Sequence, residues 1–312
     1  MTDRHFDGAR FFNPTRANGQ PVSAVPRMLA QSRTPWPPRV PVTVRRPPAR
    51  GDASAVVTFI GHSTFLIQTP FGNILTDPVY SDRASPVSFA GPRRVRQPAV
   101  AFEDLPPISV VLLSHNHYDH CDVRTLRAIE SRWRPLVVTP IGNRRLLHSM
   151  RIGRVEELDW WHDASESPIP IALTPAQHFS ARTPFDRNRA LWGGFVVKTG
   201  PHQIFFAGDS GFAPHFKEVR ERFGEIELAL LPIGAYEPRW FMRDIHMNPE
   251  EAVQAHLDLG ARRSVGMHFG TFQLTLEAID DPVHALRAAC RSHGVGDDDF
   301  RAPDFGESFV VA

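Results

Sequence analysis

The run SVVLLSHNHYDH spans residues 109–120 and joins an apolar segment to four side chains of metal-ligand type. The apolar part predicts a buried strand, because short apolar runs suit strands that are covered on both faces. Side chains two positions apart on an extended segment point the same way, so we expect His115 and His117 to converge on one metal ion. Asp119 and His120 follow where the chain turns toward the next helix, and we expect them to face a second ion.

Three further ligand-type residues each follow an apolar run: His178 after IALTPAQ, Asp209 after IFFAG and His268 after SVGM. Ligands collect at the carboxyl ends of strands in layered α/β folds, because the loops there open into a crevice. Taken alone, each histidine has a plain alternative as a hydrogen-bonded residue, and Asp209 has one as a turn former. Together with the first motif, they indicate a metal site.

The composition limits which metals fit this site. Only Cys121 and Cys290 are present, so a four-thiolate zinc site is excluded, while 15 histidines supply imidazole ligands. Zinc takes imidazole and carboxylate and keeps one position open for water in catalytic sites. Two zinc ions about 3.5 to 4 Å apart ionise a shared water and clamp the reacting oxygens. We therefore expect two Zn²⁺, with iron or manganese as alternatives for the same nitrogen and oxygen ligands.

The remaining pattern predicts an α/β fold with two mixed sheets. Residues 55–69 and 74–80 surround a Pro-Phe-Gly-Asn turn and predict the two strands of a hairpin. Further apolar runs predict strands within 136–140, 171–178, 193–199, 203–210, 228–234 and 264–270. Helical patterns lie at 123–132, 214–224, 249–261 and 281–294. Strands that alternate with helices, with a hairpin among them, indicate a layered domain over residues 51–312.

Residues 1–50 differ from this domain, because nine prolines and nine arginines stand against only two acidic residues. The segment predicts an extended arm, since proline fixes φ and removes a hydrogen-bond donor. A solvated arm is the simpler reading. The alternative is an arm that docks on the domain or on a lipid surface through apolar side chains: Phe6, Phe11, Phe12, Met28, Leu29 and Trp36.

Charge and hydropathy exclude several partners. Lys and Arg number 35 against 34 acids, so no broad electrostatic attraction to nucleic acid is expected. No run approaches the roughly 18 apolar residues of a membrane span, and the N-terminus has no apolar signal segment. We therefore expect a cytoplasmic protein whose only membrane contact is peripheral.

These motifs resemble the metallo-β-lactamase superfamily, and in particular its branch of N-acylphosphatidylethanolamine-hydrolysing phospholipase D. The resemblance runs from about residue 55 to the C-terminus and is carried by nine segments: IGHSTF (60–65), LTDPVYSDRASP (75–86), GPRRVR (91–96), SHNHYDH (114–120), ELDWW (157–161), PAQHFSART (175–183), FFAGDSG (205–211), PIGAYEPRWFM (232–242) and HMNPEEAV (246–253). It implies an αββα sandwich with the metals at one edge of the sheets, and a homodimer.

The resemblance also implies how the metal ligands are divided. One ion is held by His115, His117 and His178, the other by Asp119, His120 and His268, and Asp209 bridges both. Asp77 matches a carboxylate that orients a ligand histidine, a role that metal sites of this kind require. Its alternative is a turn before Pro78. His62 also matches and is assigned the same supporting role.

Residues near the reacting atoms follow from the same resemblance. His246 matches a position that lines the substrate site, where it would bond the phosphate or protonate the leaving alkoxide beside Asp119 and Asp209. Its alternative is a surface histidine before a helix. Tyr236, Arg239 and Trp240 match a loop near the site, and Arg239 would pair with phosphate.

The predicted activity is that of a zinc-dependent phosphodiesterase. A hydroxide formed at the two metals attacks phosphorus in an N-acylphosphatidylethanolamine-like phospholipid, which releases phosphatidic acid and an N-acylethanolamine. Two alternatives stay open: hydrolysis of a lactone or carboxylic ester, since fold does not fix substrate, and a metal- or lipid-binding protein without turnover. The role of Cys121, next to the motif, is left open by the sequence.

Overall fold

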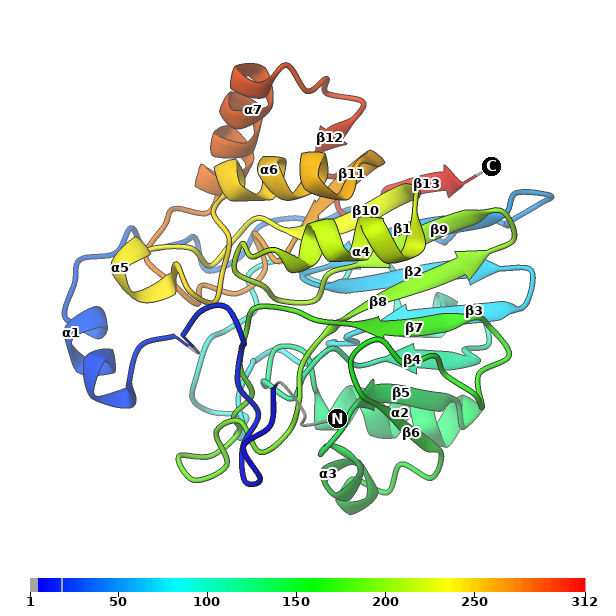
Figure 1. The fold of residues 1–312 in the computed structure, drawn as a ribbon, viewed down its shortest axis with the longest axis horizontal. Helices are drawn as coiled ribbons and strands as arrows, with labels where there is room; N and C mark the ends of the chain where they lie inside the picture. Colours follow the sequence, from blue (N-terminus) through cyan, green and yellow to red (C-terminus); the bar gives the residue numbers. More distant parts are fainter. Residues whose placement is uncertain (1–4, 18, 312) are drawn as a thin grey trace.

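A computed structural model describes residues 5–17 and 19–311, which form two stacked β-sheets between layers of helices (Figure 1). The first sheet has seven strands in the order β13-β1-β2-β3-β4-β5-β6. Its strands are β1 Ala55–Gly61, β2 Thr64–Thr69, β3 Gly72–Thr76, β4 Val110–Leu112, β5 Leu136–Pro140, β6 Val155–Leu158 and β13 Ser308–Val311. It is mixed, because β1, β2, β3 and β13 pair antiparallel whereas β3 to β6 pair parallel.

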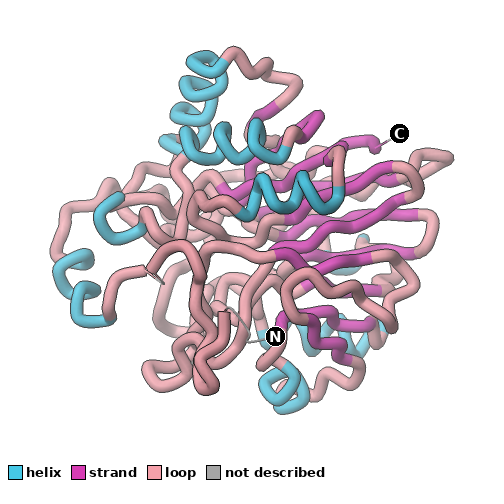
Figure 2. The backbone as a smooth tube through the Cα atoms, in the orientation of Figure 1, coloured by secondary structure: helices cyan, strands magenta, loops and turns pink. Residues whose placement is uncertain are grey.

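The second sheet has six strands in the order β12-β11-β10-β9-β8-β7. Its strands are β7 Ile171–Thr174, β8 Gly194–Thr199, β9 His202–Phe206, β10 Ile226–Pro232, β11 Ala261–Met267 and β12 Phe300–Arg301. It pairs antiparallel from β7 to β9 and parallel from β9 to β12. Figure 2 shows the strands of both sheets on one side of the molecule and long loops on the other.

Helices cover the outer faces of both sheets. On the first sheet lie α2 Val123–Trp133 and α3 Arg144–Ser149; on the second lie α4 His215–Phe223, α6 Pro249–Leu259 and α7 Asp281–His293. Short helices occur in the connections: α1 Val25–Leu29, α5 Arg239–Met242 and the 3₁₀ turns η1 Val22–Ala24 and η2 Phe102–Asp104. Within the described residues, no helix combines the length and apolar character that crossing a membrane requires.

The main core lies between the two sheets. Phe59 and Ile67 of the first sheet are fully buried in one apolar cluster with Phe195 and Phe205 of the second. A second cluster fills the space between the first sheet and α2, where Leu126 and other apolar residues are buried. Two sheets with helices outside both is the predicted αββα sandwich, which is confirmed.

The hairpin predicted for residues 55–80 is wrong in one respect. Residues 55–69 form two strands, not one, because the chain reverses between β1 and β2. Gly61 has φ 143° and His62 has φ 57°, and Gly61 pairs with Thr64 across the turn. The reversal puts His62 at the edge of the first sheet instead of inside a strand.

The described part of the arm, residues 5–17 and 19–50, lies against the domain at several points and contains α1, which the sequence pattern does not reveal. Phe11 is 8% exposed, and its backbone N–H donates to the carbonyl oxygen of Asn188 at 2.8 Å. The Trp36 indole N–H donates to the carbonyl oxygen of Glu277 at 2.9 Å. Phe12 is 36% exposed, and the side chain of Leu29 lies outside what the structure describes.

Candidate metal centre

The seven residues predicted as ligands meet at one edge of the two sheets. His115, Asp209 and His268 each follow the carboxyl end of a strand, β4, β9 and β11. Because β7 also runs parallel to β9, His178 reaches the same edge four residues after β7 ends. Most of these side chains are buried, while the Asp119 side chain remains 13% exposed. Solvent therefore reaches the cluster on the Asp119 side.

Three histidines, His115, His117 and His178, form one ligand group of the cluster, which we call the first corner. His115 Nε2 lies 2.8 Å from His117 Nδ1, and His178 Nε2 lies 3.3 Å from the same His117 atom. Donor atoms around a tetrahedral zinc with bonds near 2.0 Å lie roughly 3.3 Å apart. The three nitrogens are therefore spaced as ligands of one ion.

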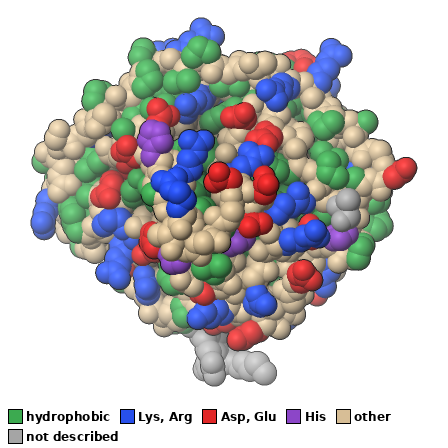
Figure 3. Space-filling view, turned by 90° about the horizontal axis from the view of Figure 1, so that it is seen from above, with side chains coloured by type: hydrophobic (Ala, Val, Ile, Leu, Met, Phe, Trp, Pro, Cys, Tyr) green, Lys and Arg blue, Asp and Glu red, His purple; other side chains and the backbone are tan. Residues whose placement is uncertain are grey.

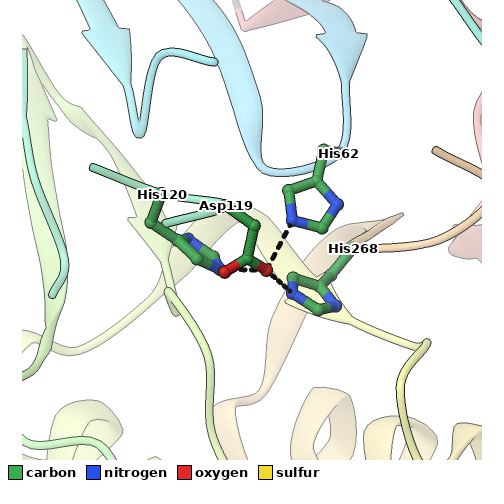
Figure 4. Close-up of side chains that lie close together, drawn as sticks. All are labelled: His62, Asp119, His120 and His268. Atoms are coloured by element: carbon green, nitrogen blue, oxygen red, sulfur yellow. Dashed lines mark hydrogen bonds and ion pairs between the residues drawn. The ribbon is translucent and has the colours of Figure 1, made fainter. Parts of the chain in front are cut away.

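Asp119 forms the second corner with His120 and His268 (Figure 4). Its Oδ2 lies 3.4 Å from His120 Nε2 and 3.3 Å from His268 Nε2. His62 Nε2 lies closer, 3.0 Å from the same oxygen, so His62 is placed to hold Asp119 and is also within reach of an ion at this corner. The structure therefore brings together the three residues predicted as the second ligand group.

Asp209 stands between the two corners. Its Oδ2 lies 3.1 Å from His120 Nε2 and 3.2 Å from His268 Nε2. The same oxygen lies 3.9 Å from His115 Nε2 and His178 Nε2. A carboxylate at this position can contact ions in both corners.

The unpaired atoms of the cluster fit a pair of cations. Among the described residues, His120 Nε2 and Asp209 Oδ1 are buried without a hydrogen-bond partner. Such atoms are costly to bury unless something else satisfies them. Two metal ions would satisfy both, so the residues present fit the metals that the pattern implies.

Asp77 fixes two of the histidines in the tautomer that a ligand needs. His120 Nδ1 donates to Asp77 Oδ2 at 2.6 Å, which directs Nε2 into the cluster. Ser114 Oγ donates to the same carboxylate at 2.5 Å, so it accepts from His115 Nδ1 at 2.9 Å. Both Nε2 atoms therefore point into the cluster and are the atoms that would bind metal, which is the function of such supporting carboxylates.

His178 is fixed by the backbone. Its Nδ1 lies 2.8 Å from the carbonyl oxygen of Ile245, which can only accept, so Nδ1 carries the proton and Nε2 faces the cluster.

Three residues at the cluster have strained backbone conformations, since His62, Asp77 and His268 have φ of 57°, 31° and 60°. Non-glycine residues in this region cost about 1 kcal/mol or more each, and they concentrate at functional sites.

Burial keeps two of the first-corner histidines neutral. It lowers the pKa of His117 to about 3 and that of His178 to about 4. Neutral imidazole is the form that binds metals. These two residues are therefore ready to bind an ion at neutral pH without losing a proton.

The second corner holds protons when no ion is bound. Burial lowers the pKa of His268, but the charge of Asp209 and the bond to Asp119 outweigh it and raise the pKa to about 9. His120 behaves alike: burial opposes its charge, but Asp209, Asp119 and Asp77 raise its pKa well above the usual value. In the absence of metal, the protonated imidazoles of His120 and His268 therefore carry the positive charge at the second corner.

His246 lies beside the cluster. It is 6% exposed, its Nε2 is 3.9 Å from Asp209 Oδ2, and its ring centroid is 5.0 Å from that of His178. Its Nδ1 has no hydrogen-bond partner among the described residues. His246 therefore has one nitrogen facing the cluster and one free for another group, in contrast to a surface histidine.

The three residues predicted to bind substrate lie around α5, next to His246. Arg239 Nη2 donates to Glu251 at 2.7 Å and its Nη1 donates to the carbonyl oxygen of His246 at 2.9 Å. Tyr236 is 8% exposed, and Arg27 of the arm lies over the Trp240 ring, 4.4 Å from its centroid. The guanidinium of Arg239 is thus already engaged with protein groups.

Two supporting residues were missed by sequence reasoning. Ser114 lies inside the quoted motif but carries no signal of its own, and Asn13 lies in the arm, far away in sequence. Asn13 Nδ2 donates to the carbonyl oxygen of His178 at 2.7 Å.

Cys121 is fully buried and burial raises the pKa of its thiol to about 11, so the reactive thiolate is disfavoured.

The geometry agrees with comparisons to known proteins. Residues 72–269 match the β-lactamase superfamily domain. A solved structure, the isothiocyanate hydrolase from Delia radicum gut bacteria, shares the fold with a TM-score of 0.68 at 22% identity, over 82% of this chain and 99% of its own. The chain therefore belongs to the β-lactamase superfamily and is a metallohydrolase of that fold.

Relatives found by sequence similarity show which branch of the superfamily the chain belongs to. A protein of Caenorhabditis elegans named N-acyl-phosphatidylethanolamine-hydrolyzing phospholipase D 1 is 37% identical over 273 residues, which is 82% of this chain and 76% of its own. An uncharacterized protein of Mycobacterium tuberculosis is 40% identical over 265 residues, or 83% of this chain and 70% of its own. The chain falls in the phospholipase D-like branch that its motifs resemble.

Proposed function

We propose that this chain is a two-metal phosphodiesterase of phospholipase D type that hydrolyses N-acylphosphatidylethanolamine-like lipids. The observation that carries the proposal is Asp209 Oδ2, which lies between two ligand groups at 3.1 to 3.9 Å from four histidine nitrogens. The 37% identity to the worm phospholipase over 82% of the chain supports the lipid substrate. All seven ligand-type side chains are present, which argues against a protein without turnover.

The metals would be two zinc ions. His115, His117 and His178 would hold one, Asp119, His120 and His268 the other, and Asp209 would contact both. Bound in this way, the ions would supply a water of lowered pKa and stabilise negative charge on the phosphoryl oxygens. Imidazole and carboxylate suit iron and manganese as well, and metal analysis of protein purified without chelator decides between them.

The protein's own groups would orient and protonate. We propose that His246 donates a hydrogen bond from Nε2, the nitrogen that faces the cluster, to the phosphate and relays to the leaving alkoxide the proton that the attacking water gives up. Burial lowers its pKa well below the usual value, so it would donate as a neutral imidazole. Asp119, the most exposed acid of the cluster, faces the side from which substrate enters.

Residues around α5 would shape the substrate side. We propose that Tyr236 and Trp240 border the path of the substrate. Arg239, whose guanidinium bonds Glu251 and the carbonyl oxygen of His246, would hold His246 in position and add positive potential for the phosphate.

The test is an assay panel with the full chain, with and without chelator. A fluorogenic N-acylphosphatidylethanolamine and bis-p-nitrophenyl phosphate represent phosphodiesters, and a lactone and a β-lactam represent carbonyl substrates. We expect chelator-sensitive hydrolysis of the phosphodiesters, with water consumed and phosphatidic acid and N-acylethanolamine released from the lipid. Turnover of the carbonyl substrates alone would replace the proposal with the lactonase or esterase alternative.

The proposal also covers the oligomeric state, the location and the partners of the protein. A homodimer, a cytoplasmic location and peripheral membrane contact are proposals that sedimentation and fractionation of cells test directly. Figure 3 shows basic and acidic side chains interspersed over one face of the molecule. This mixed charge supports the expectation that nucleic acid is not a partner.

A further inference from the structure

Two phenylalanines are far more exposed than other large apolar side chains of the described residues. Phe89 is 81% exposed and Phe185 is 80% exposed. The next, Val44, is 53% exposed. Leaving an aromatic ring in water forfeits most of the free energy that its burial would give, so a pair of such rings marks an interaction site when the two lie together.

The loops that carry these rings lie on the two sides of one cavity. Residues 81–83, residues 85–88 and Arg182 line a cavity of about 340 Å³, together with Tyr118. The Tyr118 hydroxyl donates to the carbonyl oxygen of Arg182 at 3.0 Å, which ties the second loop to the motif. Phe89 directly follows the first loop segment, and Phe185 is three residues after Arg182.

This cavity is next to the metal cluster. Arg182 Nη1 donates to the carbonyl oxygens of Asn116 and Cys121 at 2.7 and 2.9 Å, and the segment between these two residues carries His117, Asp119 and His120. The first loop leaves the cluster at Asp77 and the second leaves it at His178. Both loops therefore project from the same edge of the sheets as the metal centre.

Local hydrogen bonds hold both loops in shape. Arg83 donates from Nε to the carbonyl oxygen of Ser88 at 3.0 Å and from Nη1 to that of Gly91 at 2.6 Å. Asp186 accepts from the backbone N–H groups of Arg182 and Thr183 at 3.0 and 2.8 Å. Because the loops are already ordered, presenting the rings to a partner costs little conformational entropy.

The charge of the loops identifies the partner. Residues 81–91 and 181–189 contain four arginines and two aspartates, a net charge of +2, and Arg124 at the start of α2 borders the same cavity. Exposed aromatic rings among arginines suit the interface of an anionic bilayer, where rings enter the headgroup region and guanidinium groups meet phosphates. A protein interface would instead have a contiguous apolar core, whereas these two rings lie on separate loops.

We propose that residues 81–91 and 181–189 form a membrane-docking rim, with Phe89 and Phe185 as the inserting side chains. The rim deepens the proposed function and rests on it in one respect: it brings a phospholipid headgroup to the metal edge. Docking itself requires no turnover, so the two proposals can fail separately.

The test is co-sedimentation of the full chain with vesicles of phosphatidylcholine and phosphatidylglycerol. We expect binding of the native protein and a loss of roughly tenfold or more in the vesicle partition coefficient of the double variant F89S/F185S. The matched control is F71S/V310S, which removes two side chains that are each 51% exposed on the β2–β3 turn and on β13. Unchanged binding of the control completes the expected result.

A charge variant tests the second half of the proposal. R124E/R189E should abolish the preference for phosphatidylglycerol over pure phosphatidylcholine vesicles and flatten the salt dependence, whereas R287E on α7 should not. Failure of the native protein to sediment with vesicles, or equal sedimentation of F89S/F185S, overturns the rim. Hydrolysis of bis-p-nitrophenyl phosphate should persist in F89S/F185S; its absence from the native protein would refute the proposed activity but not the docking.

Discussion

Asn13 in the N-terminal arm donates from Nδ2 to the carbonyl oxygen of His178, a predicted metal ligand, at 2.7 Å. Trp192 in turn donates from its indole N–H to Asn13 Oδ1 at 3.2 Å. The ring of His178 is held from the other side by the carbonyl oxygen of Ile245. The arm is therefore part of the support of the candidate metal centre, although 165 positions separate the two residues in sequence.

Replacing Asn13 by alanine should weaken zinc binding by about tenfold, in the range known for groups that support metal ligands. The backbone of His178 would lose its anchor, and its ring would spend less time in the position for binding. Competition with a chromophoric chelator measures this affinity. The control is N143A, which removes another buried amide that donates to a backbone carbonyl, that of Pro140, away from the cluster. Equal zinc affinity of N13A and native protein would refute the link.

Asp77→Ala should have a larger effect, because this carboxylate fixes His120 directly and His115 through Ser114. We expect zinc affinity to fall by about 10- to 100-fold. Asp122→Ala serves as a control, since Asp122 is another buried carboxylate whose donors, Ser81, Arg124 and Thr125, are not metal-ligand residues. Its loss should cost about 1 to 3 kcal/mol of stability, because buried donors lose their partner, and leave zinc affinity intact. Similar metal affinities for the two variants would contradict the assignment.

Zinc binding should release protons at pH 7. In the metal-free protein His268 has a pKa of about 9 and that of His120 is raised well above the usual value, so both are protonated. His117 and His178, with pKa values of about 3 and 4, are already neutral. We expect release of about two protons per chain, and an affinity that falls as the pH drops from 9.

The stability of the metal-free protein depends on pH in the opposite direction from its zinc affinity. Because the folded pKa of His268 lies above the unfolded value, its protonation stabilises the metal-free fold below about pH 6.5, and this contribution is lost as the pH rises through 9.

Calorimetric titration with zinc in buffers of different ionisation enthalpy counts the protons that zinc binding releases. A proton count near zero would mean that the second corner does not take up the metal through these histidines.

His246→Ala should lower turnover of bis-p-nitrophenyl phosphate by roughly 10²- to 10⁴-fold while the metal content stays at the native level. The expected cause is loss of the group that bonds phosphate and protonates the alkoxide. His256→Ala is a matched control, because His256 is equally buried and its Nδ1 lies 2.8 Å from Ser264 Oγ, away from the cluster. Native turnover in His246→Ala would remove His246 from the chemistry.

The sequence allowed the layers of the fold to be predicted because its strands are short, apolar and followed by ligand-type residues. It misled at His62 and Ser63, the two-residue reversal between β1 and β2, because the polar stretch at 61–64 is short and lies between two apolar runs. The strands β6, β12 and β13 were missed, since VEEL at 155–158 carries two acids and the others lie at the ends of the sheets. Strand pairing at an edge depends on tertiary contacts more than on composition.

The candidate site, like the fold, could be predicted from the sequence only in part. The spacing of the motif was enough to predict that His115 and His117 converge, because side-chain direction along an extended segment is a local property. The contact of Asn13 with His178 depends on where the arm folds back, which no local pattern encodes. Arg239 was predicted to pair with phosphate, but its sequence context does not reveal the carboxylate of Glu251, 2.7 Å away.

Gly234→Ala should also disrupt the second metal corner. A Cβ atom at Gly234 would lie 2.2 Å from the carbonyl oxygen of His268, and real Cβ atoms do not approach backbone this closely. The backbone of His268 would have to move, and with it the ring that faces Asp119 and Asp209. We expect loss of about one of two zinc ions per chain, measured by elemental analysis. The control is Gly153→Ala, whose Cβ would meet only the flexible carboxylate of Glu130 at 3.2 Å. If Gly234→Ala kept both zinc ions with native affinity, His268 would not depend on this close packing, and its position as a ligand would need another explanation.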